Sequence, residues 1–87
     1  MLKNKGKVIQ IIGPVIDVRF EHDALPSLYN AVLIQNSGAL IVAEVMQHLG
    51  NDTVRCVSMT STDGLARGAE AEDTGGPIKV PVGEPVL

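Results

Sequence analysis

The feature that most constrains the fold is a series of short β-branched runs, each interrupted after a few residues by glycine, proline or asparagine. Lys7–Ile12 (KVIQII) and Val15–Phe20 (VIDVRF) stand on either side of a single Gly13-Pro14 step. Valine and isoleucine supply 18 of the 87 residues, and β-branched side chains favour strands over helices. We find no convincing helical segment, so the pattern predicts short strands joined by tight turns.

Apolar and polar side chains alternate in these runs with the period of a half-buried strand. Ile16, Val18 and Phe20 share one face, which we expect to line the core, while Asp17 and Arg19 share the other. The predicted strands are Lys7–Ile12, Val15–Phe20, Ala31–Gln35, Leu40–His48, Thr53–Met59 and Ile78–Val82, the last interrupted by Pro81.

The turn residues suggest how these strands are connected. Asn36-Ser37-Gly38 and Gly50-Asn51-Asp52 are hairpin signals, while Gly13-Pro14 fits either a hairpin or a corner in one long strand. Glu21–Asn30 reads as an irregular connection, and Glu70–Asp73 as an acidic, exposed segment. About six short strands in fewer than 90 residues predict an all-β fold, a small closed six-stranded antiparallel β-barrel. A two-sheet sandwich is the alternative.

Composition excludes several classes of protein. The single cysteine, Cys56, allows no internal disulfide and no cysteine-based metal site, and two histidines are too few to suggest a zinc cluster. A net charge of −3, with Phe20 and Tyr29 as the only aromatic residues, argues against nucleic-acid binding. The apolar stretches are too short for a secretory signal or a membrane span, so we expect no membrane insertion and an intracellular location.

Motifs for phosphate binding are also missing. A phosphate-binding loop requires a lysine directly after its second glycine, whereas Gly64-Leu65-Ala66-Arg67-Gly68 has the wrong spacing and is followed by alanine. Gly75-Gly76 precedes a proline, which lacks the N–H that an anion nest would use. No hairpin tip displays the lysine that a lipoyl or biotin carrier needs.

The side chains with catalytic potential each have a plainer structural explanation. Asp63 belongs to an Asp-Gly turn, and His48 stands near a strand end. Glu44 is a lone carboxylate in a strand, while Cys56 has apolar neighbours typical of a buried, inert thiol. We therefore predict no catalytic, cofactor-binding or metal-binding residue. From the residues alone, the chain is a small all-β interaction module.

Five longer strings are more specific than these patterns. Together, and in this order, they closely resemble the N-terminal domain of the beta subunit of the rotary ATP synthase, in its bacterial or organellar form. The strings LYNAV, QHLG and STDGL favour the beta over the related alpha subunit. The five strings are GKVIQIIGPVIDVRF (6–20), LPSLYNAV (25–32), EVMQHLGNDTVRCVSM (44–59), STDGLARG (61–68) and DTGGPIKVPVG (73–83).

The resemblance implies a six-stranded barrel that alternates with alpha-subunit barrels in a ring at the end of the catalytic headpiece farthest from the membrane. It implies a structural role, with ATP synthesis or hydrolysis on Mg-ATP/ADP confined to later domains of the full-length subunit. The expected organisation is a flexible N-terminal arm (1–5), a barrel (6–83) and the start of a linker (84–87), with Val80–Gly83 as the exit from the barrel.

The family also sets expectations for partners and location. The partners would be alpha subunits, in a complex peripheral to the cytoplasmic side of an energy-transducing membrane and driven by hydrogen ion transport. We expect exposed apolar patches flanked by charge on the outside of the barrel, and an isolated domain that is monomeric or weakly self-associating. The alternative is a stand-alone β-barrel binding module that only resembles this family.

Overall fold

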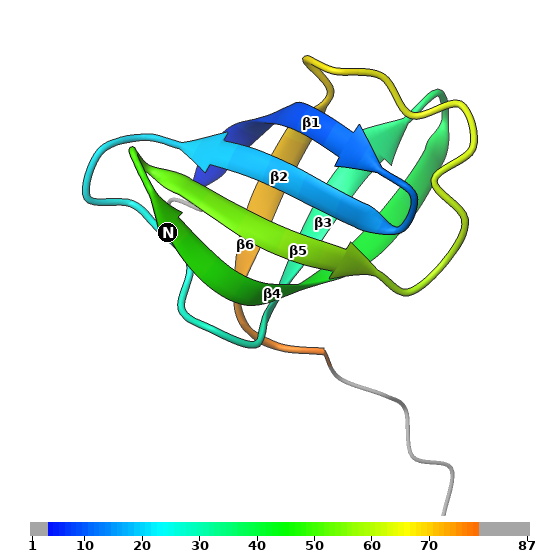
Figure 1. The fold of residues 1–87 in the computed structure, drawn as a ribbon. Helices are drawn as coiled ribbons and strands as arrows, with labels where there is room; N and C mark the ends of the chain where they lie inside the picture. Colours follow the sequence, from blue (N-terminus) through cyan, green and yellow to red (C-terminus); the bar gives the residue numbers. More distant parts are fainter. Residues whose placement is uncertain (1–3, 79–87) are drawn as a thin grey trace, which may run out of the picture.

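The computed structural model describes residues 4–78, which form six strands and no helix (Figure 1). This confirms the expected all-β class for the described part of the chain. The strands are β1 (Lys5–Ile12), β2 (Val15–Phe20), β3 (Asn30–Asn36), β4 (Ala39–Gly50), β5 (Thr53–Ser58) and β6 (Glu70–Pro77).

The strands close into an antiparallel barrel in the order β1-β2-β5-β4-β3-β6, with β6 paired to both β3 and β1. Closure confirms the barrel and excludes the two-sheet sandwich. Because three strand steps separate β2 from β3 in either direction, these two strands lie on opposite walls. The same argument places β1 opposite β4.

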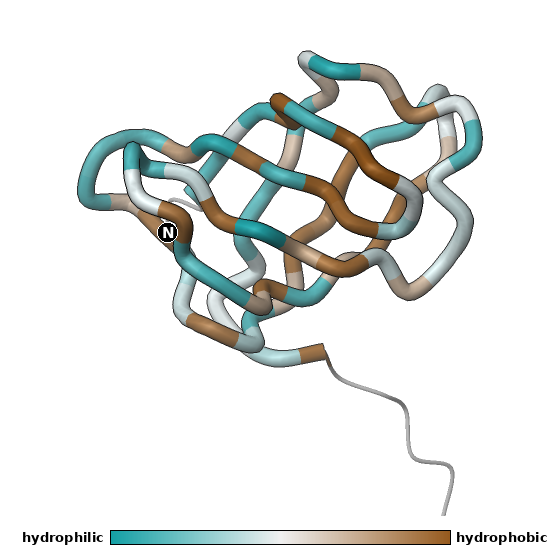
Figure 2. The backbone as a smooth tube through the Cα atoms, viewed as in Figure 1, coloured by the Kyte–Doolittle hydropathy of each residue, from teal (hydrophilic) through white to brown (hydrophobic). Residues whose placement is uncertain are grey.

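The core is aliphatic and lies inside the barrel. Ile16, Val18 and Phe20 are buried, as their alternation predicts, and Figure 2 shows hydrophobic and hydrophilic positions alternating along several strands. The buried core cluster consists of Val8, Ile16, Val18, Phe20, Val32, Ile34, Ile41, Ala43, Val45, Val54, Cys56 and Ala71. Each strand contributes at least one of these residues, so the core is shared by all six strands.

Two-residue turns fix the register of the predicted hairpins. Ser37 and Gly38 join β3 to β4 with φ values of 49° and 88°, and Asn51 and Asp52 join β4 to β5 with 53° and 60°. Positive φ at both central residues is the backbone that matches the twist of the flanking strands. Gly13-Pro14 also forms a hairpin turn rather than a corner, because β1 and β2 pair directly.

The sixth strand differs from its prediction. β6 spans Glu70–Pro77, whereas the sequence pattern placed the strand at Ile78–Val82 and left Glu70–Asp73 exposed. Ile78 lies outside any strand, and the rest of the expected segment, like the exit at 80–83, lies outside the described residues. Ala71 and Asp73 point inward and are buried. The neighbouring acidic residues Glu70 and Glu72 made this segment look exposed in the sequence.

Asp73 is buried because polar groups from three segments surround its carboxylate. Asn30 Nδ2 donates to Oδ1 at 3.1 Å, and the Gly75 backbone N–H donates to the same oxygen at 2.9 Å. Asn4 Nδ2 lies 3.5 Å from Oδ2, and the Asp73 N–H donates to the Asn4 carbonyl. Strand pairing therefore begins at Lys5, with Asn4 already bonded, just before the barrel boundary expected at Gly6.

Candidate functional site

The structure places the residues with catalytic potential in separate parts of the barrel. His48 Nε2 donates to the Pro26 carbonyl at 2.7 Å and so ties the end of β4 to the β2–β3 connection. Asp63 forms two hydrogen bonds through its backbone. Its carbonyl accepts from Asn36 Nδ2, and its N–H donates to Ser61 Oγ. Glu44 lies half-buried on the outer wall, between Val57 of β5 and Ala31 of β3.

Cys56 is fully buried within the core cluster. Burial, and secondarily the nearby charge of Asp17, raises the pKa of its thiol to about 12. The thiolate is the reactive form of cysteine, so this thiol is held in its unreactive state at neutral pH. Its burial matches the prediction of an inert side chain.

Asp17 and Arg55 form an ion pair on the outer wall that the sequence pattern alone did not reveal. Arg55 Nε donates to Oδ1 of Asp17 at 2.9 Å and Nη2 donates to Oδ2 at 3.0 Å, while Gln10 Nε2 donates to Oδ2 at 3.3 Å. Asp17 is only 5% exposed although it faces outward. The hydrogen bonds and the charge of Asp17 raise the pKa of Arg55, so the guanidinium stays fixed and charged.

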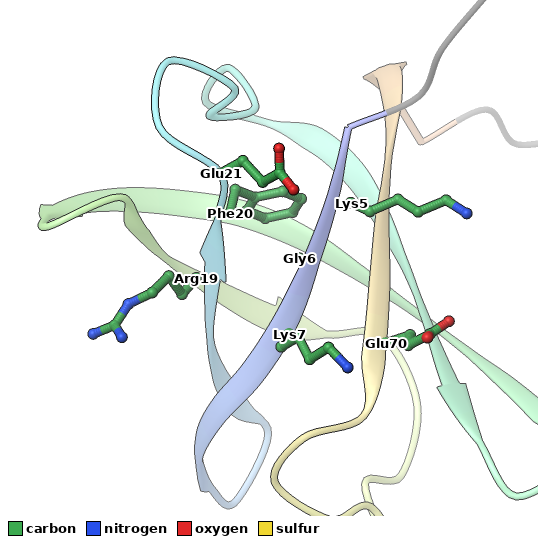
Figure 3. A pocket seen from close by; sticks show the side chains of 7 residues that line it. All are labelled: Lys5, Gly6, Lys7, Arg19, Phe20, Glu21 and Glu70. Atoms are coloured by element: carbon green, nitrogen blue, oxygen red, sulfur yellow. The ribbon is translucent and has the colours of Figure 1, made fainter.

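A shallow hollow of about 310 Å³ lies beside β1 and β2 (Figure 3). Gly6 and the Phe20 ring are part of its surface, and Figure 3 shows the ring between the two strands. Three cations and two carboxylates complete the lining, which consists of Lys5, Gly6, Lys7, Arg19, Phe20, Glu21 and Glu70. We call this the cationic wall.

A second hollow, of about 450 Å³, lies on the other side of the barrel, over β3, β4 and β6. Leu33 and Val42 face each other across β3 and β4, with Ala31 beside them and 74–78 along the edge. Glu44 lies directly opposite Ala31 on this wall. We call this surface, with Glu44, the apolar wall.

Large apolar side chains are also exposed elsewhere on the described surface. They are Ile12, Leu28, Tyr29, Leu40, Met46, Leu49 and Met59. Scattered apolar residues are normal on a protein surface, so the two walls rather than these single positions define the candidate interaction surfaces.

Within residues 4–78 no group of three or more His, Cys, Asp or Glu side chains is arranged to hold a metal ion. The same part of the chain includes no helix of the length and apolarity needed to cross a membrane.

Comparison with protein families decides what kind of barrel this is. Residues 8–75 match the model of the ATP synthase alpha/beta family, beta-barrel domain. The chain belongs to this family. The match spans β1 to β6, which agrees with the closed six-stranded fold. It supports a place in the alpha/beta headpiece of an ATP synthase, a complex peripheral to a membrane, and it does not separate alpha from beta subunits.

Proposed function

We propose that this chain is the N-terminal barrel of a beta-type, catalytic subunit, and that it holds the headpiece together by packing between alpha-subunit barrels. The main support for this proposal is the family match over residues 8–75. The barrel also has two chemically different walls on opposite sides. The strings LYNAV, QHLG and STDGL favour the beta type. A ring requires each member to contact two neighbours, which opposed walls allow.

In this proposal the barrel is not an enzyme by itself. Mg-ATP and ADP would be bound by other domains of the full-length subunit, which would act in a hydrogen-ion-driven ATP synthase peripheral to the cytoplasmic side of its membrane. No side chain of the barrel would touch the nucleotide. Titration calorimetry of this chain with Mg-ATP should show no saturable heat, and micromolar binding would contradict this assignment.

The assembly role is tested by co-expressing the full-length subunit that carries this barrel with alpha-type subunits and weighing the product by native mass spectrometry. We expect a hexamer with equal numbers of the two subunits. A full-length subunit that assembles only in the absence of alpha partners, or that stays alone, would favour the stand-alone binding module instead. A beta-type subunit also requires a G-x-x-x-x-G-K-[ST] sequence downstream of this barrel.

A further inference from the structure

Two cations stand side by side on the cationic wall without a carboxylate in ion-pair contact. Lys7 of β1 and Arg19 of β2 are directly opposite each other in the strand register, and both are exposed. Neither forms an ion pair within 4 Å with any described residue, although Glu70 lies opposite Lys7 on β6. Like charges directly opposite on neighbouring strands destabilise a sheet.

The geometry of the side chains agrees with this repulsion. Figure 3 shows the Arg19 guanidinium and the Lys7 ammonium pointing in opposite directions, away from the backbone between them. The hollow at this position contains three cations, Lys5 included, against Glu21 and Glu70. One further carboxylate placed over the hollow would balance the lining charges, and the exposed Lys7 and Arg19 are the cations nearest to each other in the strand register.

The opposite wall of the same fold offers a carboxylate in a suitable place. Glu44 is on β4, diametrically across from β1, and Leu33 and Val42 lie beside it on the same outer wall. Barrels that stand side by side in a ring and use opposed walls meet head to tail, with unlike surfaces in contact. In such a ring the β4 wall of the neighbour, the wall that carries Glu44 in this chain, would meet the β1–β2 wall of this chain.

On the basis of the proposed function, we propose that the Lys7–Arg19 pair is the receptor for a carboxylate on the β4 wall of the neighbouring barrel in the ring. The like-charge pair weakens the isolated barrel and is compensated when the neighbour is in place. Charge complementarity would then select which wall of the neighbour docks here, as it does at other interfaces.

The substitution Arg19→Glu tests this because it has opposite effects on folding and on assembly. In the isolated barrel it converts a like-charge pair with Lys7 into an opposite-charge pair, so the Tm should rise by about 1–5 °C. In the full-length subunit it places a carboxylate against the neighbour's carboxylate. Association with alpha subunits, measured by native mass spectrometry across a concentration series, should weaken at least about tenfold.

Arg67→Glu is the matched control. Arg67 is exposed in the β5–β6 connection, and the substitution changes net charge by the same amount. It should leave association within about twofold of the unsubstituted subunit, and Arg19→Lys should behave likewise because it keeps the cation. If the Arg19→Glu subunit assembled as well as the Arg67→Glu subunit while the unsubstituted hexamer formed normally, the proposed role of the Lys7–Arg19 pair would be wrong. The assembly role of the barrel would still stand. Failure of the unsubstituted subunit to join alpha partners would refute the proposed function itself.

Discussion

At the residue scale, Gly6 shows how closely the wall of the barrel approaches its core. A Cβ atom at this position would lie 2.5 Å from the Arg19 carbonyl oxygen and 3.0 Å from the Phe20 ring. The carbonyl belongs to the paired β2 backbone, which cannot move without disturbing the ladder. Glycine is therefore required here by space, and the same contact lets β1 lie over the only phenylalanine of the chain.

Gly6→Ala should consequently lower the free energy of unfolding by about 1–3 kcal/mol, the usual cost of overpacking. The control is Gly76→Ala, because a Cβ there meets nothing within 4 Å. That change should be neutral or stabilising by up to about 1 kcal/mol, since alanine restricts the unfolded chain. Urea denaturation measures both, and equal stabilities of the two variants would contradict the close approach at Gly6.

The raised pKa of the Cys56 thiol predicts a decline in the stability of the barrel at alkaline pH. The thiol has a pKa of about 12 in the barrel and an ordinary value of 9.0 when unfolded, so between these pH values only the unfolded chain releases the proton. The free energy of unfolding should therefore fall by about 1.4 kcal/mol per pH unit above pH 9 from this group. Below pH 9 the thiol contributes no slope, because both states hold the proton.

The measurement is urea denaturation between pH 7 and pH 11 for the natural chain and for Cys56→Ala. Alanine removes the titrating group, so the difference between the two curves isolates the thiol from all other groups. The difference should be constant up to pH 9 and then shrink. A constant difference over the whole range would show that the thiol is accessible to ionisation in the folded barrel.

At the element scale, the β3–β4 hairpin is held by a turn whose first residue is not ideal. Ser37 has φ 49°, a left-handed backbone that asparagine tolerates better than serine, and Gly38 already suits the second position. Ser37→Asn should stabilise the barrel by about 0.3–1 kcal/mol, whereas Ser37→Val should destabilise it because β-branched residues resist positive φ. Thermal unfolding followed by circular dichroism checks both, and a Tm for Ser37→Asn below that of Ser37→Val would contradict the turn geometry.

An element could be predicted from the sequence when its signal lies in neighbouring residues, and not when it depends on residues far away in the chain. The hairpins at Ser37-Gly38 and Asn51-Asp52, and the inward face of β2, follow from neighbouring residues, and they were predicted correctly. β6 has no such local signal, because its acidic residues read as exposed. It is a strand because β1 and β3 offer free edges on either side, and Asp73 is buried because Asn30 reaches it from 43 residues away.

The candidate site divides in the same way. The family strings identified the barrel from sequence, and Arg19 was correctly placed on the outer face of its strand. The Asp17–Arg55 pair and the juxtaposition of Lys7 with Arg19 depend on strand register, which residue alternation does not specify. Which charged residues lie opposite each other on neighbouring strands can be determined only after the pairing of β1, β2 and β5 is known.

At the scale of the whole molecule, closure decides how the barrel can associate. Every strand has two partners, so the described barrel offers no free edge for addition of a strand from another chain. Contacts must therefore be made through side chains on the outer walls. The two walls differ in chemistry, and a head-to-tail contact between two copies of this chain would place the cationic wall against Glu44.

This limits the affinity of the isolated chain for itself. Stable specific interfaces usually bury at least about 1,200 Å², more than a single contact between two shallow walls is expected to provide. Full-length subunits add further contacts, which raise affinity through effective concentration. The 87-residue chain should therefore sediment as a 9.2 kDa monomer at micromolar concentration, with weak association near millimolar that salt reduces. A salt-independent dimer at low micromolar concentration would show that an apolar contact, rather than the charged walls, governs its association.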